Sequence, residues 1–210
     1  MGAAGLRAVV LLGAVSSLGA SGPSASPRPA PSVPGLTWDL ADSLERRLKA
    51  IETSFKSRKR LKDPNVLVRE TELNSYLNLT LASQLPPGVT DLLVHLEKDR
   101  VSAKGLVDLD RLPVKQAASA SAFNPLSFLS GRVAVELRGK LTTQDGFGTF
   151  VPEDIRLATI PIPASVVAQA VAQSTRTAEN PQGFDILSPF RLPYGAKRVR
   201  LQPAKILLEF

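Results

Sequence analysis

The spacing of hydrophobic residues divides most of the chain into segments with helical or extended periods. Apolar residues recur every three or four positions from Leu36 to about Arg58, which is typical of one face of an α-helix. Thr37 is expected to cap the start of this helix. A short apolar strand at residues 65–68 and a second helix, closed by Pro-Pro-Gly at 86–88, follow it. The apolar stripe of the first helix comprises Leu36, Leu40, Leu44, Leu48, Ile51 and Phe55.

Beyond Gly88 the apolar period falls to two, which predicts long antiparallel β-hairpins with one apolar face. The first hairpin is expected to turn at residues 98–100, and the second at the Asp-Gly pair of residues 145–146, a dipeptide typical of two-residue turns. Residues 152–154 predict a bulge or break in the second hairpin. A third hairpin closes the chain, and residues 119–130 leave open a helix or an irregular crossover.

The segment TIPIPASVVAQAVAQST (159–175) predicts a helix after Pro163 that carries no charge. Its polar residues Ser165, Gln169 and Gln173 form one thin stripe, so the remaining Ala and Val face needs apolar surroundings. Two interpretations stay open: the small side chains leave volume beside the sheet for a ligand, or the helix closes a close-packed core without a cavity. The order of elements predicts an α+β fold, in which a long curved antiparallel β-sheet is wrapped around one or two apolar helices and preceded by the N-terminal amphipathic helix.

The N-terminal residues predict export. One cation, Arg7, precedes an apolar run that is too short to span a bilayer comfortably, and small residues follow, so residues 1–20 are interpreted as a cleaved signal peptide. An uncleaved anchor or a buried N-terminal segment is the alternative. Residues 21–35 form a Pro-rich linker, residues 36–62 the amphipathic basic helix, and residues 63–210 the remaining domain. We expect the protein in the periplasm or cell envelope.

Positive charge is concentrated in two runs. The chain of 210 residues has a formal net charge of +7 and no cysteine, which favours anionic partners and excludes disulfides and thiolate metal sites. The first run, residues 56–62 (KSRKRLK), holds five bases in seven positions. The second run lies in the terminal hairpin and comprises Lys197, Arg198 and Arg200. Both runs predict contact with lipid head groups or an anionic membrane surface. The alternative for the first run is a solvated helix end. The alternative for the second is a set of outward-facing residues that keep an edge hairpin soluble. The candidate contact residues are Lys56, Arg58, Lys59, Arg60, Lys62, Lys197, Arg198 and Arg200.

The chain lacks the sequence signatures of common enzyme sites. It contains no nucleophile elbow, Ser-x-x-Lys pair, P-loop or Gly-x-Gly-x-x-Gly fingerprint. Its single histidine, His95, alternates with leucines as a surface residue of a strand would. Carboxylates at Asp108 and Asp110, and the pair at residues 153–154, are expected to be solvated rather than to hold a metal. We therefore predict no enzyme, no cofactor and no metal; export, and the scarcity of aromatic residues among the bases, argue against a nucleic-acid partner.

Three motifs together resemble small bacterial envelope proteins of the tubular lipid-binding (TULIP-like) superfamily. They are RETELNSYL (69–77), IPIPASVVAQAVAQ (160–173) and PFRLPYGAKRVRLQPAKILLEF (189–210). The similarity covers Val66 to Phe210 in element order. It implies long strands around an apolar helix, with a tapered groove that holds acyl chains and sequesters or transfers lipid in the envelope. Many members of the superfamily have no assigned function, and the Pro-rich linker, the basic helix and the lack of a lipoprotein cysteine depart from its pattern.

Strand pattern and resemblance together give the hypothesis of a lipid- or acyl-chain-binding envelope protein, with residues 63–210 as its TULIP-like domain. The expected lipid-lining residues are Val133, Val135, Leu137, Leu141, Phe150, Ile162, Val166, Val167, Ala170, Val171, Val199 and Leu201. The alternative is a non-catalytic structural or adaptor protein of the envelope with a filled core. Its amphipathic helix would then dock a protein partner.

Overall fold

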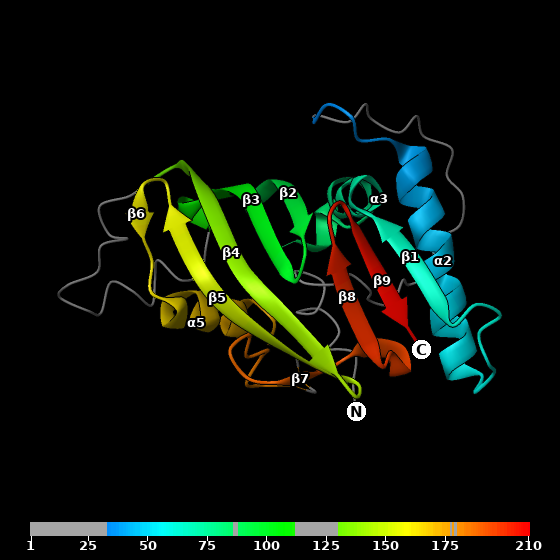
Figure 1. Ribbon diagram of the computed structural model, residues 1–210. Coiled ribbons are helices and arrows are strands. Elements are labelled where there is room, and N and C mark those ends of the chain that lie inside the picture. The colour runs from blue at the N-terminus through cyan, green and yellow to red at the C-terminus, as the bar shows by residue number, and fades with distance from the viewer. Residues whose placement is uncertain (1–32, 86–87, 112–129, 177, 179) are drawn as a thin grey trace.

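The computed structural model describes residues 33–210, apart from 86–87, 112–129, 177 and 179. The predicted signal peptide and most of the linker and crossover lie outside the described residues. Within them the chain has an α+β fold (Figure 1). The helical elements are α2 (Trp38–Lys56), α3 (Glu70–Ser75), η1 (Tyr76–Thr80), η2 (Ala82–Gln84), η3 (Leu109–Arg111), α5 (Ala164–Ser174) and η5 (Pro193–Gly195). The strands are β1 (Asn65–Arg69), β2 (Val89–Glu97), β3 (Arg100–Asp108), β4 (Arg132–Gln144), β5 (Phe147–Leu157), β6 (Ile160–Pro161), β7 (Phe190–Arg191), β8 (Arg198–Gln202) and β9 (Lys205–Glu209).

The larger sheet is antiparallel and open, with strand order β2-β3-β4-β5-β6 and β7 paired with β5. Asp145 and Gly146 turn the β4–β5 hairpin with φ of 50° and 81°, the left-handed conformations that a tight hairpin turn requires. Arg138 pairs with Asp154 while Gly139 pairs with Pro152, so one extra residue lies in β5 at this point. The predicted turn and bulge are both confirmed.

The smaller sheet joins the terminal hairpin to β1 in the order β1-β9-β8, and hydrogen bonds tie it to the larger sheet. The Gly146 N–H donates to the Lys197 carbonyl at 2.9 Å. The Thr143 hydroxyl accepts from the Val199 N–H at 2.8 Å and donates to the Val199 carbonyl at 2.7 Å. The turn of the β4–β5 hairpin and the C-terminal strands are thus fixed relative to each other.

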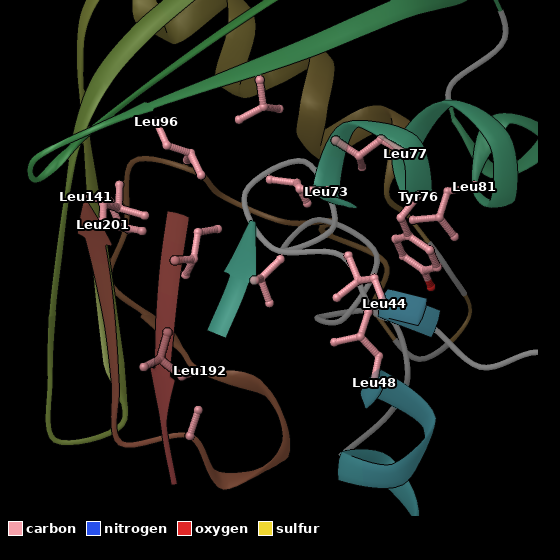
Figure 2. Packing of buried hydrophobic residues seen from close by; sticks show 14 of the residues in the cluster. Leu44, Leu48, Leu73, Tyr76, Leu77, Leu81, Leu96, Leu141, Leu192 and Leu201 are labelled. Carbon is pink, nitrogen blue, oxygen red and sulfur yellow. The ribbon is translucent and has the colours of Figure 1, made fainter. Parts of the chain in front are cut away.

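Helix α2 begins where the sequence predicts but ends at Lys56, so most of the basic run that was expected in a helix of residues 36–62 lies beyond it. The helix contributes to the main core. The Thr37 hydroxyl accepts a hydrogen bond from the Leu40 N–H at 3.3 Å, which caps the helix. Two i,i+4 acid–base pairs form on its surface, at 2.9 and 2.6 Å. Leu44 and Leu48 are buried together with Leu77 of η1 (Figure 2). Side chains from residues 36–62 therefore belong to the main hydrophobic core, together with buried residues of β2, β4, β5, β8 and β9.

Helix α3 lies beside β2, on the side away from β3, and its side chains bond the main chain of that strand. The Glu70 carboxylate accepts the Leu96 N–H at 2.7 Å. The Asn74 side-chain amide accepts the Val94 N–H at 2.7 Å and donates to the Val94 carbonyl at 2.9 Å, and both bonds are buried. Because β2 is the outermost strand of the larger sheet, no further strand pairs with this side of it. The side-chain bonds satisfy main-chain groups that would otherwise lack partners.

Asn78 of η1 extends this set, because its side-chain amide donates to the Leu92 carbonyl at 2.6 Å. Residues 70, 74 and 78 are spaced by four and share one helical face, while their partners are alternate residues of β2. The acid and amide residues of the RETELNSYL motif therefore hold a helix against a strand.

Glu72 fixes the start of the same helix. Its carboxylate accepts the Arg69 N–H at 2.9 Å, as in the acidic half of a capping box. The Arg47 guanidinium of α2 donates to it at 2.6 Å. Burial raises the pKa of Glu72, but the hydrogen bonds and charge of Arg47, with the Arg69 N–H, hold that pKa below its usual value.

Candidate ligand-binding site

Helix α5 lies against one face of the larger sheet, near β5 and β6 (Figure 1). Its Val166 and Val167 pack against a cluster that contains Ile155 and Leu157 of β5. None of the side chains from residue 164 to residue 173 is fully buried. The sequence predicts that the Ala and Val face is hidden, whereas the structure covers it only in part. An uncharged helix that stays half-exposed is a candidate surface for an apolar ligand.

The predicted lining residues divide between two hydrophobic clusters. Leu141, Phe150 and Leu201 are 7%, 2% and 5% exposed, and Val171 and Val199 pack around this main core. Figure 2 shows Leu141 and Leu201 side by side within it. The second cluster lies under α5, and Leu137 and Val167 contact both clusters. Its members from the predicted set are Ile162, which is buried, and Val133, Val135, Leu137, Val166 and Val167, which are half-buried. Ala170 is also half-buried on α5. A ligand on this face would therefore meet the second group, because Leu141, Phe150 and Leu201 of the first are buried inside the protein.

The C-terminal end of α5 is held by the chain that follows it. The buried Thr175 hydroxyl accepts the Phe184 N–H at 2.8 Å and donates to the Val171 carbonyl at 2.7 Å. Gly183 has a φ of 74°, and a Cβ there would lie 1.8 Å from the Ala172 carbonyl oxygen. Only glycine fits such a close approach, so the helix end is fixed in position.

A separate pocket of about 600 Å³ opens between the C-terminal end of α2, turn η5 and the end of β9. These segments lie together at one end of the molecule (Figure 1). Phe55, which the sequence places in the buried stripe of α2, is 55% exposed there. The lining residues are Ile51, Ser54, Phe55, Lys59, Arg60, Leu61, Pro64, Tyr194, Gly195, Lys197 and Phe210. The wall is thus mostly apolar and aromatic, and all of its charged side chains are basic.

The pocket brings together both predicted basic runs. Lys59 and Arg60 come from the first run and Lys197 from the second. No ion pair involves Lys59 or Arg60 within the part of the chain that the structure describes. The Lys197 ammonium lies 3.4 Å from the Phe210 main-chain oxygen. An anion in the pocket would therefore meet at least two unpaired cations.

The other predicted head-group residues lie outside the pocket lining. Lys56 pairs with Glu52 at 2.6 Å, and Arg200 pairs with Glu209 at 2.6 Å. The side chains of Arg58, Lys62 and Arg198 are exposed to solvent. These residues contribute positive charge to the surrounding surface.

Tyr194 forms one wall of the pocket in a strained conformation. Its φ is 52°, which is unfavourable for a bulky residue. Its ring packs edge-on against Phe55, with centroids 6.0 Å apart. Its hydroxyl is buried and has no hydrogen-bond partner among the residues that the structure describes. Burial, together with the nearby Glu52 and Tyr76, raises the pKa of Tyr194, so the hydroxyl stays protonated.

Polar groups elsewhere are engaged in surface contacts. His95 is exposed and lies 3.3 Å from Glu70. Glu153 pairs with Arg100 at 3.0 Å, and Asp154 with Arg156 at 3.0 Å. Across the described ranges, no three His, Cys, Asp or Glu residues are grouped closely enough to hold a metal ion. No described helix combines the length and hydropathy needed to cross a bilayer.

Comparison with protein-family models, with curated proteins and with solved structures gives no match for this chain. The similarity to the tubular lipid-binding superfamily therefore stays a prediction. Any functional assignment depends on the two sites just described, the α5 face and the pocket.

Proposed function

We propose that this protein binds the acyl chain of a lipid between α5 and the larger sheet, and that it sequesters or transfers lipid in the cell envelope. The observation that supports this is the incomplete burial of every side chain from residue 164 to residue 173, on a helix with no charge. A protein that needed this helix only as core would gain stability by covering it fully.

The proposal includes two features of the predicted family pattern. The larger sheet curves around α5, and the half-buried Val133, Val135 and Val166 face the acyl chain. The signal peptide directs the protein to the periplasm or cell envelope. Leu141, Phe150 and Leu201 support the site from the core without touching the ligand.

The hydrophobic effect would supply most of the affinity. A chain of roughly sixteen carbons, at about 0.8 kcal/mol for each buried methylene, gives a gross term of about 12 kcal/mol. A basic residue near an anionic surface contributes only about 1 kcal/mol, and salt reduces that contribution. The apolar face between α5 and the sheet would therefore determine how tightly lipid binds.

The adaptor alternative has less support from the packing. It requires α2 to offer its apolar stripe to a protein partner. Leu44, Leu48 and Ile51 of that stripe are 1%, 7% and 3% exposed, because they belong to the main core. Deleting residues 36–62 would open this core, so α2 is poorly suited to serve as a detachable docking helix.

Fatty-acid binding by matched tryptophan variants tests the proposal. Ala170 is half-buried on α5, and its neighbour Gln169 is exposed on the same helix. We expect the full chain to bind a fluorescent fatty acid and to carry lipid in native mass spectrometry. Ala170→Trp should weaken binding at least tenfold by filling the site, whereas Gln169→Trp should leave it unchanged. Ligand-free protein with no fatty-acid uptake, or equal effects of the two variants, would contradict the proposal.

A further inference from the structure

We propose that the pocket between α2, η5 and the end of β9 binds a phosphate monoester that carries a compact apolar group. This site is separate from the acyl-chain site on α5 and does not depend on it. The phosphate belongs either to a soluble ester or to the head group of a lipid. The pocket's volume of about 600 Å³ lies within the range usual for small-molecule sites.

The apolar part of such a ligand matches the pocket wall. Phe55 and Tyr194 both line the pocket, and their rings pack edge-on at an interplanar angle of 69°. Ile51, Leu61 and Phe210 complete the apolar lining. Phe55 stays 55% exposed although Leu44, Leu48 and Ile51 of the same stripe are buried. A large exposed ring inside a concave site is a typical contact for an apolar ligand.

The phosphate of such a ligand matches the positive charge of the pocket lining. Lys59 and Arg60 have no ion-pair partner among the described residues, and the pocket lining contains no Asp or Glu. The main chain that leads to them is held at the helix end, because the Lys59 N–H donates to the Ser54 carbonyl at 2.9 Å and the Ser57 N–H to the Thr53 carbonyl at 2.9 Å. An Arg fork beside a Lys is well suited to phosphate oxygens, which accept several charge-assisted hydrogen bonds.

A solvated helix end would also explain basic residues after α2, since cations are favourable at a helix C-terminus. That explanation does not account for Lys197, which comes from the opposite end of the sequence and lines the same pocket. It also does not account for Tyr194, whose left-handed backbone and unpartnered buried hydroxyl both cost free energy. Strained backbone conformations of this kind are found most often at functional sites.

The test uses the full chain, 1-naphthyl phosphate as probe, and calorimetric titration. We expect saturable binding of 1-naphthyl phosphate and much weaker binding of 1-naphthol, which lacks the phosphate. The double variant Lys59→Glu/Arg60→Glu should weaken binding by about tenfold or more, as expected for the loss of charge-assisted hydrogen bonds. The control Arg58→Glu/Lys62→Glu changes net charge equally at exposed neighbours outside the pocket lining, and it should change affinity less than about threefold.

A second arm distinguishes the source of the phosphate. Phosphatidylcholine vesicles with and without phosphatidate are floated with the same proteins. Retention by phosphatidate vesicles that only the Lys59/Arg60 variant loses indicates a lipid head group, and binding of the soluble ester alone indicates a free ligand. Absence of binding to both probes, or equal weakening by the two double variants, would overturn the proposal. Ala170→Trp should leave 1-naphthyl phosphate binding intact, so failure of one site is separable from failure of the other.

Discussion

Replacing Asn74 with alanine should destabilise the protein, because the Asn74 side chain makes two buried hydrogen bonds that join α3 to β2. The Asn74 amide is 7% exposed and bonds both main-chain groups of Val94, at 2.7 and 2.9 Å. Alanine removes both bonds and leaves a buried N–H and a buried carbonyl without partners. The neighbouring polar side chains on the same helical face do not replace them, because Glu70 of α3 already bonds Leu96 and Asn78 of η1 already bonds Leu92.

The magnitude follows from these two groups. A buried polar group that loses its partner costs about 1–3 kcal/mol. Two such groups cost about 2–6 kcal/mol, and we expect about 3 kcal/mol because water can reach part of the opened site. This is a large fraction of the roughly 5–15 kcal/mol that stabilises a typical domain.

Urea unfolding followed by the fluorescence of Trp38, the single tryptophan, measures the effect. A loss of about 3 kcal/mol lowers the midpoint by about 1 M or more for a protein of this size. Asn65→Ala is the matched control, because Asn65 is exposed on β1; its effect should stay within about 0.5 kcal/mol. If both variants unfolded at the same urea concentration, the side-chain bonds to β2 would not be important for stability.

Two further predictions concern single groups. The depressed pKa of Glu72 means that its ionised form stabilises the fold above its unfolded pKa, near 4.5, and that this contribution is lost as pH falls through the lower folded value. Glu72→Gln should therefore reduce the free energy of unfolding at pH 7 and flatten its decline below about pH 5; parallel pH profiles for variant and wild type would contradict this. Tyr194→Phe removes a buried hydroxyl that has no partner, so it should raise the free energy of unfolding by about 1 kcal/mol. A destabilised Tyr194→Phe protein in thermal unfolding would show that the hydroxyl is satisfied.

Periodicity predicted the elements well where one face is buried and the other is solvated. The stripe of α2, the alternation in β2 to β5 and the Asp-Gly turn at 145–146 follow local rules that a single segment contains. The same rules failed for Phe55, because its position in the stripe is helical while its surroundings depend on η5. The exposed fraction of a side chain at a helix end depends on which distant part of the chain packs against it, and the sequence of the helix alone does not contain that information.

The two sites differed in how far they could be predicted. The α5 face was visible as an uncharged segment, but its half-covered state depends on strands distant in sequence. The pocket joins residues 51–64 to residues 194–210, and no local signal links these ranges. The Glu and Asn residues at 70, 74 and 78 resemble a solvated helical face, and only the structure shows them bonded to a strand.

The side-chain bonds along β2 also restrict how this protein can associate with others. An outer strand normally offers a row of free main-chain groups to which another chain can add. Here α3 and η1 occupy those groups on β2, and at the other border β6 is only the pair Ile160–Pro161, whose proline has no N–H to donate. Addition of a foreign strand to β2 is therefore blocked, which leaves side-chain surfaces as the means of recognition along that border.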